Sequence, residues 1–352
     1  MNDLRRGLPG LLILLGVGGL CGLIARGAGL PLPFLVGGLA GGLISVPVMT
    51  RLDVPHAFPK PLRPLFVAVI GVLIGATFTP DLLAVLPSLP ITLAAMTLFV
   101  PLAHALGYVI CRRIGGYDRP TALFSAMPGG LIEGIAFGQE VGGDVRVLTL
   151  HHFARVISVA VLVPILFLLW KGEVVGSSAG QALVKAGGLV DVAIVIVLSA
   201  IGMAVGMRIR LPAGHLMGPM ILAGAIQASG LWTVGGPEWL LDLAQLMVGG
   251  GLAHQMGNPT LALARRVVLA SLSMVVAVLT IGICVGFALA NLVPLSLEAL
   301  ILSFSPGGVA EMGLIALSLH ISPVIVAAHH TYRIALTVIV AAFLRHRALR
   351  AA

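Results

Sequence analysis

The chain has 352 residues, of which 59% are hydrophobic and only 10% charged, and its formal net charge is +8 at pH 7. A soluble protein is about one quarter charged, so this chain has too few charges to cover a soluble globule. Its mean hydropathy is +1.10, and several apolar runs reach the roughly 20 residues that a membrane-spanning helix needs. We therefore predict an all-α polytopic membrane protein. This composition excludes a soluble enzyme and a soluble DNA-binding protein.

The apolar segments form two sets of six along the chain. The first set lies near residues 9–25, 33–50, 63–79, 88–111, 120–138 and 147–170. The second set lies near residues 188–207, 213–229, 239–256, 267–291, 297–318 and 322–344. The N-terminal segment has the basic start and apolar run of a signal peptide, but no cleavage site precedes a polar mature domain. We expect it to be the first spanning helix.

Residues that recur at a spacing of 178 indicate that the chain holds two copies of one unit. Pro128, Gly129, Gly130 and Glu133 recur as Pro306, Gly307, Gly308 and Glu311, and His151, His152 and Arg155 recur as His329, His330 and Arg333. We predict two membrane repeats, residues 1–175 and residues 186–352.

The placement of basic residues indicates that the two repeats are inverted. If every apolar segment spanned the membrane, the basic loops of the second half would lie outside, against the positive-inside rule. If each Pro-Gly-Gly segment instead enters and leaves on one side, nearly all basic loops become cytoplasmic, and the exceptions are Arg26 and the loop 171–185. Asp81, Glu238, Asp242 and Glu298 then lie outside. Each repeat has about five spanning helices and one re-entrant or broken segment, and both termini are cytoplasmic.

The Pro-Gly-Gly motif predicts a break in the helix from Met127 to Gly130, because proline lacks an N–H and glycine adopts non-helical dihedrals. The half-helix that follows would present free backbone N–H groups to an anion or a polar group. A simple kink or a close helix crossing is the alternative. Irregular backbone at membrane depth is tolerated where it lines a cavity or is buried in protein, and paired broken segments in inverted repeats mark the binding site of secondary transporters.

Two acidic residues follow the breaks, and two serines precede them. Glu133 and Glu311 fall in the first turn after each break, where they could carry a coupling proton, bind Na+ or bind a cationic substrate. A structural ion pair with an arginine is the alternative. Ser125 and Ser303 could cap the break or line the site.

A histidine and an arginine lie four residues apart in each copy, on one face of a predicted helix. Arg155 and Arg333 lie too deep in their spans to reach the membrane surface, so they must face protein, water or a ligand. They could bind an anionic substrate or neutralise the two glutamates. His151 and His329 could relay protons. For His152 and His330, on another face, we expect hydrogen bonds between helices.

We expect no metal site and no cofactor. The two histidines of each pair diverge by about 100° on a helix, and no cysteine or aspartate completes a ligand set. The three cysteines have no metal-binding spacing and are interpreted as packing residues.

The doubled motif, Pro-Gly-Gly-x-x-Glu followed by His-His-x-x-Arg, resembles the bacterial AbrB membrane family, which is built from two AbrB duplication units. The resemblance covers essentially the whole chain. Members of this family carry the labels ammonia monooxygenase and transcriptional regulator, the latter from a member described as a regulator of AidB. This chain has neither a copper or iron ligand set nor a DNA-reading module. The resemblance agrees with a membrane protein related in outline to inverted-repeat carriers, an analogy at the level of the fold.

These features predict an inner-membrane secondary transporter of a small solute rather than an enzyme, with alternating access and coupling to H+ or Na+. The expected partners are the lipid bilayer, the solute, the coupling ion and another copy of the chain in a homo-oligomer, with no nucleic acid. A membrane-embedded regulator that binds a ligand without moving it is the alternative. A metal-dependent membrane monooxygenase is the third and least favoured interpretation of the function. The sign of the substrate's charge stays open, because the motif carries both acids and arginines.

Overall fold

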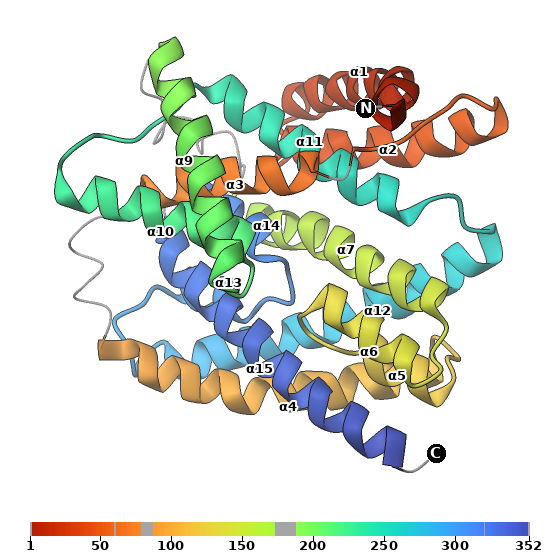
Figure 1. Ribbon diagram of the computed structural model, residues 1–352. Helices are drawn as coiled ribbons and strands as arrows, with labels where there is room; N and C mark the ends of the chain where they lie inside the picture. The colour runs from red at the N-terminus through yellow and green to blue at the C-terminus, as the bar shows by residue number, and fades with distance from the viewer. Residues whose placement is uncertain (1, 60, 79–86, 173–187, 320, 351–352) are drawn as a thin grey trace. The chain divides into compact units, whose positions relative to one another are not determined.

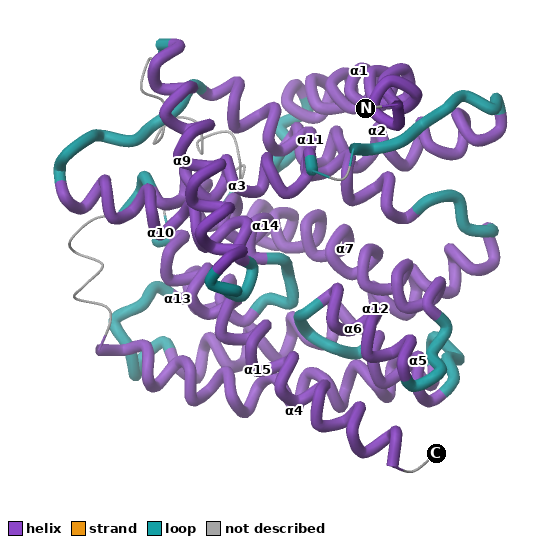
Figure 2. Tube along the Cα trace, viewed as in Figure 1, coloured by secondary structure: helices purple, strands orange, loops and turns teal. Residues whose placement is uncertain are grey.

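The computed structural model describes residues 2–59, 61–78, 87–172, 188–319 and 321–350. Within these ranges the chain forms helices joined by loops and turns, with no strand (Figure 2). The helices are α1 (Asn2–Gly27), α2 (Pro33–Arg51), α3 (Leu62–Gly75), α4 (Leu89–Arg113), α5 (Arg119–Ser125), α6 (Leu131–Glu140), α7 (Val145–Lys171), α9 (Leu189–Arg208), α10 (Gly214–Ser229), α11 (Glu238–Met256), α12 (Leu261–Leu289), α13 (Leu297–Phe304), α14 (Val309–Ser318) and α15 (Pro323–Arg350). The all-α prediction is confirmed.

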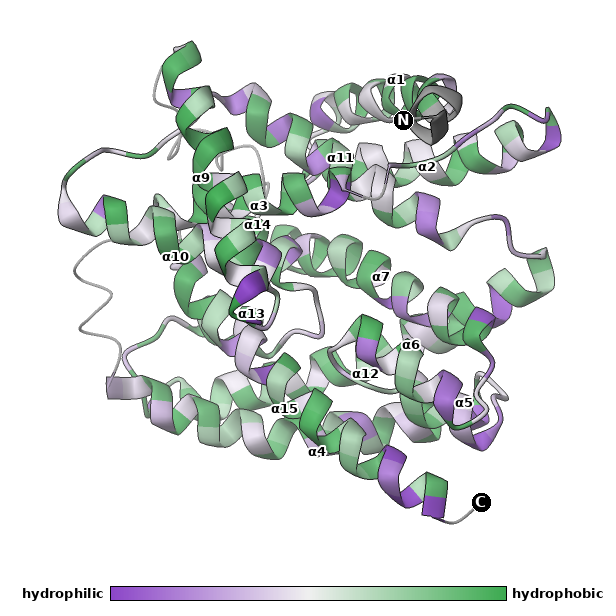
Figure 3. Cartoon of the chain, in the orientation of Figure 1, coloured by the Kyte–Doolittle hydropathy of each residue, from purple (hydrophilic) through white to green (hydrophobic). Residues whose placement is uncertain are grey.

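Seven of the described helices are long and apolar enough to cross a membrane, namely α1, α2, α4, α7, α9, α12 and α15. Figure 3 shows the nearly continuous apolar colouring of α9. Large apolar side chains such as Leu98 and Leu189 remain exposed, as contact with lipid requires. The chain is thus a multi-pass membrane protein. Of the three further spans expected from the sequence, two form the shorter helices α3 and α10, of 14 and 16 residues, and the third forms α11, of 19 residues.

The boundaries of the helices follow the 178-residue spacing. Helix α14 begins and ends 178 residues after α6. The helices before the two breaks also begin alike: Asp118 caps α5 and Ser296 caps α13, and each side chain accepts a hydrogen bond from the backbone N–H three residues later. The local sequence therefore gives both copies the same short helix, break and second helix.

Contacts within the chain define two compact units, and each unit contains helices from both halves of the sequence. Unit 1 comprises residues 1–82, 161–258 and 309–324, and so holds α1 to α3, α9 to α11 and α14. Unit 2 comprises residues 83–160, 259–308 and 325–352, and so holds α4 to α6, α12, α13 and most of α15. Helix α7 contributes its first part to unit 2. The repeats over 1–175 and 186–352 remain a prediction about how the chain was duplicated.

Unit 1 packs through small residues that bring the backbones of two helices together. A Cβ atom on Gly71 in α3 would clash with the carbonyl oxygen of Leu216 in α10, and one on Gly249 in α11 would clash with that of Leu35 in α2. Such close approach is typical of helix pairs in membranes. Because these pairs join the third helix of one half to the second helix of the other, neither half can complete this packing alone.

An ion pair within unit 1 accounts for Arg26, one of the two exceptions to the positive-inside rule in the predicted topology. The guanidinium of Arg26, at the end of α1, lies 2.7 Å from Glu238 and 2.9 Å from Asp242. The predicted topology places these two acids on the same side as Arg26, so the paired charge is compatible with it. The other exception, the loop 171–185, lies mostly outside the described residues, as does Asp81.

We predict that Gly249→Leu disrupts the packing of α2 against α11, because the added side chain has no space at this crossing. Overpacking of this kind costs roughly 1–3 kcal/mol or more, and we expect a lower melting temperature and less monodisperse protein on size-exclusion chromatography in detergent. Gly16→Leu is the matched control, because nothing lies within 4 Å of a Cβ built at Gly16. Equal stability of the two variants would contradict the packing described here.

Candidate binding site at the Pro-Gly-Gly breaks

The first Pro-Gly-Gly segment is a helical hairpin. Helix α5 ends at Ser125, α6 begins at Leu131, and the two short helices pack against each other (Figure 1). Asp144, which follows α6, donates its backbone N–H to the hydroxyl of Thr121 in the first turn of α5, at 2.8 Å. The chain therefore enters and leaves this segment at the same end, as a re-entrant segment does. The predicted helix break from Met127 to Gly130 is confirmed.

The backbone of Gly130 determines where the second helix of the hairpin begins. Gly130 precedes α6 with φ at 63°, in the left-handed region that glycine adopts most easily. A Cβ at this position would lie 3.2 Å from Oε2 of Glu133, so the glutamate folds back toward the break. Glu133 is only partly buried and lies in the first turn of α6, where a negative charge interacts favourably with the helix dipole.

Both predicted site arginines are buried and hydrogen-bond the backbone of a break. Arg155 donates from Nη1 to the carbonyl of Met127, and Arg333 donates from Nη1 to the carbonyl of Ser305. These two acceptors are themselves 178 residues apart. Arg333 also donates from Nη2 to the carbonyl of Gly307. The exposed fractions of the two side chains are 4% and 1%, which confirms that they face protein rather than the membrane surface.

The predicted histidine pairs are also buried, and one member of each pair contacts the short helix before a break. Nε2 of His330 lies 3.0 Å from the carbonyl of Leu302 in α13, and His152 lies beside the equivalent carbonyl of Phe124 in α5. The contact of His330 agrees with the expected bonding between helices, whereas both ring nitrogens of His152 lack a hydrogen-bond partner among the described residues. His151 and His329 contact other side chains: Tyr117 at 3.2 Å and Thr92 at 2.8 Å, respectively.

Tyr117, the partner of His151, lies in the loop between α4 and α5. Its side chain is buried, and burial raises the pKa of the phenol, so that it stays protonated at physiological pH. The ring of Tyr117 also lies beneath the guanidinium of Arg266, 5.2 Å from its centroid. Neither Tyr117 nor Thr92 was predicted from the sequence, because neither recurs at the 178-residue spacing.

The structure brings the predicted site residues together in unit 2, with the exception of Glu311. Unit 2 contains Ser125, Pro128, Gly129, Gly130, Glu133, His151, Arg155, Ser303, Pro306, Gly307, Gly308, His329 and Arg333. Glu311 is buried in unit 1 on α14, which packs against α3, and Arg63 is its basic neighbour there. Among the described residues, no ion pair joins Arg155 or Arg333 to Glu133 or Glu311. The arginines therefore bond backbone carbonyls rather than the two acids.

Several polar atoms around the breaks are buried without a hydrogen-bond partner. They include the hydroxyls of Ser125, Ser303 and Thr337, the Nε atoms of Arg155 and Arg333, both ring nitrogens of His152 and Nδ1 of His330. Thr337 comes from α15, and its hydroxyl lies 3.5 Å from a Cβ built at Gly129 in the first break. The serines and the arginines are equivalent pairs at the 178-residue spacing, so the unused hydrogen-bonding capacity is duplicated as well.

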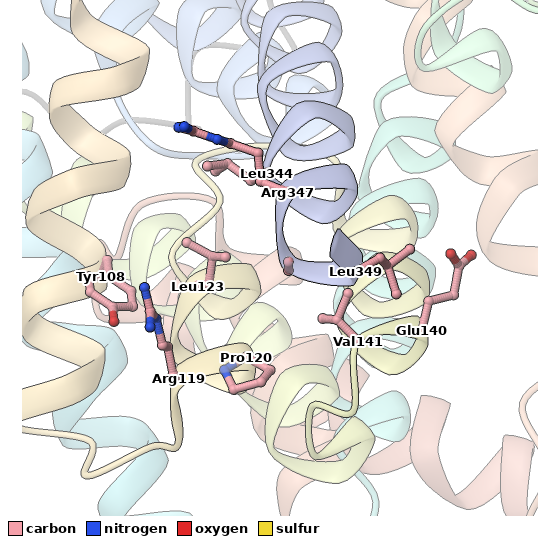
Figure 4. Close-up of a pocket in the computed structure, with 10 residues that line it drawn as sticks. Tyr108, Arg119, Pro120, Leu123, Glu140, Val141, Leu344, Arg347 and Leu349 are labelled. Atoms are coloured by element: carbon pink, nitrogen blue, oxygen red, sulfur yellow. The ribbon is translucent and has the colours of Figure 1, made fainter. Parts of the chain in front are cut away.

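Unit 2 also contains an open cavity of about 710 Å³ between α15 and the hairpin (Figure 4). Its lining combines apolar side chains with Tyr108, Arg119, Glu140 and Arg347. Glu140 lies 2.5 Å from the guanidinium of Arg345 and is partly exposed. The cavity lining includes none of the predicted site residues, so it is separate from the breaks. In the described parts of the chain, no three His, Cys, Asp or Glu side chains gather as metal ligands.

A sequence model of one protein family, described as "Transition state regulatory protein AbrB", matches residues 39–348. The chain belongs to the AbrB family. It is 24% identical to "Putative regulator AbrB" of Escherichia coli (strain K12) over 307 residues, which cover 87% of this chain and 86% of that protein. It is 25% identical to "Uncharacterized protein YhjN" of Bacillus subtilis (strain 168) over 285 residues, which cover 77% and 74% of the two chains. The resemblance inferred from the doubled motif is confirmed.

We predict that Arg333→Met lowers the stability of this AbrB family member more than Arg155→Met does. Each substitution removes the donor to buried carbonyls, at about 1–3 kcal/mol for each carbonyl left unpaired. Arg333 serves two carbonyls and Arg155 serves one. Thermal unfolding of the purified variants in detergent measures the difference. Arg345→Met is the control, since Arg345 pairs with a partly exposed carboxylate and lies over the Phe137 ring but donates to no buried carbonyl in the described residues. A control as unstable as Arg333→Met would contradict this account.

Proposed function

We propose that this protein is a secondary transporter of a small solute, and that the solute binds at the Pro-Gly-Gly breaks. The observation that carries the proposal is the duplicated bonding of a buried arginine to the backbone of each break, from Arg155 to Met127 and from Arg333 to Ser305. Carriers built from paired broken helices place their substrate and ion sites at such breaks. The two compact units support the proposal, because alternating access requires one body of helices to move against another.

Glu133 and Glu311 are the candidate coupling residues in this proposal, for H+ or Na+. An acid within the membrane is expensive and by default functional. The partial exposure of Glu133 would allow it to exchange an ion, and buried Glu311 lies beside the basic Arg63 within unit 1. The proposal includes an inner-membrane location with both termini cytoplasmic, a role in transport rather than catalysis, and a homo-oligomeric assembly.

A membrane-embedded regulator is the second candidate, because one relative is named "Putative regulator AbrB". Such a protein would bind its ligand at the same breaks and act on gene expression through a partner. It would show ligand binding without solute movement. The third candidate, a metal-dependent monooxygenase, would require a ligand set that the described residues do not bring together.

We predict that solute-driven ion movement in proteoliposomes depends on Glu133 and Glu311. The assay uses purified protein with a pH-sensitive dye inside the vesicles, or a Na+ gradient with labelled solutes, and a panel of organic acids, amino acids and amines. Glu133→Gln and Glu311→Gln should each reduce coupled flux at least tenfold, because glutamine cannot release a proton or carry a negative charge.

Glu140→Gln is the matched control for that experiment. Glu140 lies on the same helix as Glu133 but is exposed and paired with Arg345, so coupled flux should persist in this variant. Full coupled flux in both Glu133→Gln and Glu311→Gln would show that neither acid is needed for coupling. Ligand-induced thermal stabilisation without flux of any solute would favour the regulator instead.

A further inference from the structure

The two buried arginines of unit 2 form a positive site whose charge is not balanced by any described carboxylate. Arg155 donates to Met127 in the first break, and Ile334, next to Arg333 on α15, packs against Gly129 of the same break, so both arginines lie near one segment. The hydrogen bonds given above go to neutral carbonyl oxygens of the two breaks. Glu133 forms no ion pair with either arginine, and Glu311 is placed in unit 1 beside Arg63.

Such an arrangement favours a bound anion on physical grounds. Buried charges are normally paired, because removal from water costs several kcal/mol for each ion unless an opposite charge lies nearby. Carbonyl dipoles offset part of this cost, but they do not cancel two like charges that repel each other in a medium of low dielectric. An anion between the two guanidinium groups would relieve the repulsion and the desolvation together.

The unpartnered polar atoms show that hydrogen-bonding capacity remains for such an anion. Nε of each arginine is buried without a partner, and so are the hydroxyls of Ser125, Ser303 and Thr337. Buried polar groups nearly always have a partner, so these five atoms, together with the unpartnered ring nitrogens of His152 and His330, call for a ligand or bound solvent. All five can donate a hydrogen bond, a property that suits an anion.

The apolar neighbours of the breaks indicate an organic anion rather than an inorganic one. Apolar side chains lie beside the two glycines of the first break, namely Ile334 beside Gly129, and Val338 and the break's own Met127 beside Gly130. These side chains would contact the apolar body of a ligand, whereas the guanidinium and hydroxyl groups would contact its charged end. A carboxylate also matches the planar edge of a guanidinium, which can donate two parallel hydrogen bonds.

From this geometry we infer that the breaks of unit 2 bind a small organic carboxylate, with Arg155 and Arg333 holding its charge and Ser125, Ser303 and Thr337 adding hydrogen bonds. This inference rests on the proposed function in so far as it names the solute class of the same site. It assigns the negative sign to a substrate whose charge the sequence left open.

The test measures binding to the purified full-length protein in detergent by thermal shift and calorimetry. The probes are sodium acetate, sodium butyrate, sodium phosphate and sodium chloride at equal Na+ concentration, with tetramethylammonium chloride as the cationic probe. We expect a saturable stabilisation by acetate and a stronger one by butyrate. Equal effects of chloride or phosphate, or stabilisation by tetramethylammonium alone, would overturn the assignment to a carboxylate.

Serine variants separate ligand binding from a purely structural role. Ser125→Ala and Ser303→Ala remove hydroxyls that have no protein partner, so the ligand-free melting temperature should stay unchanged or rise. Carboxylate affinity in the double variant should fall at least roughly tenfold, as expected for lost hydrogen bonds to a charged group. Ser271→Ala is the matched control, because Ser271 is equally buried and unpartnered but lies on α12, which does not flank either break in the sequence. Unchanged affinity in the double variant would overturn the inference.

Binding and flux measured together distinguish failure of this inference from failure of the proposed function. Saturable carboxylate binding without flux in proteoliposomes would uphold the anion site and contradict transport. Flux of an amine or a neutral solute without carboxylate binding would uphold transport and contradict the anion site.

Discussion

A protein backbone that leaves the helical path inside a membrane must find its hydrogen-bond partners within the protein, because lipid offers none. This constraint organises unit 2. Each Pro-Gly-Gly sequence interrupts a helix and leaves carbonyl groups without intrahelical donors. Arg155 and Arg333 supply those donors from longer helices that follow each break. The arginines therefore stabilise the broken backbone.

The same bonding has an electrostatic consequence. An arginine tied to a carbonyl carries its full positive charge into the protein interior, whereas a neutral donor such as asparagine would not. Two such arginines lie near the first break in unit 2 and have no described carboxylate partner. A role confined to bonding the backbone would not require two charges. In the proposed transporter, the charge left over from this structural role becomes the binding determinant for the solute.

The sequence predicted the elements whose cause is local. Proline lacks an N–H and glycine tolerates a positive φ, so the break at Met127 to Gly130 followed from residue chemistry. The burial of Arg155 also followed from the local sequence, because the residue lies deep within an apolar run. The bonding partners of the site could not be predicted. Tyr117, Thr92 and Arg63 meet their partners through long-range packing, and none of them has a counterpart in the other half of the chain.

The duplicated sequence produces two breaks with unequal surroundings. Both helices of the first hairpin belong to unit 2, whereas the second break separates α13 in unit 2 from α14 in unit 1. Glu133 thus stays with the arginines' unit and is partly exposed, while Glu311 is buried beside Arg63. Identical motifs therefore place their acids in different electrostatic environments. In the proposed carrier, Glu133 would act within unit 2, which holds both arginines, and Glu311 within unit 1 beside Arg63, so the two acids would take different parts in coupling.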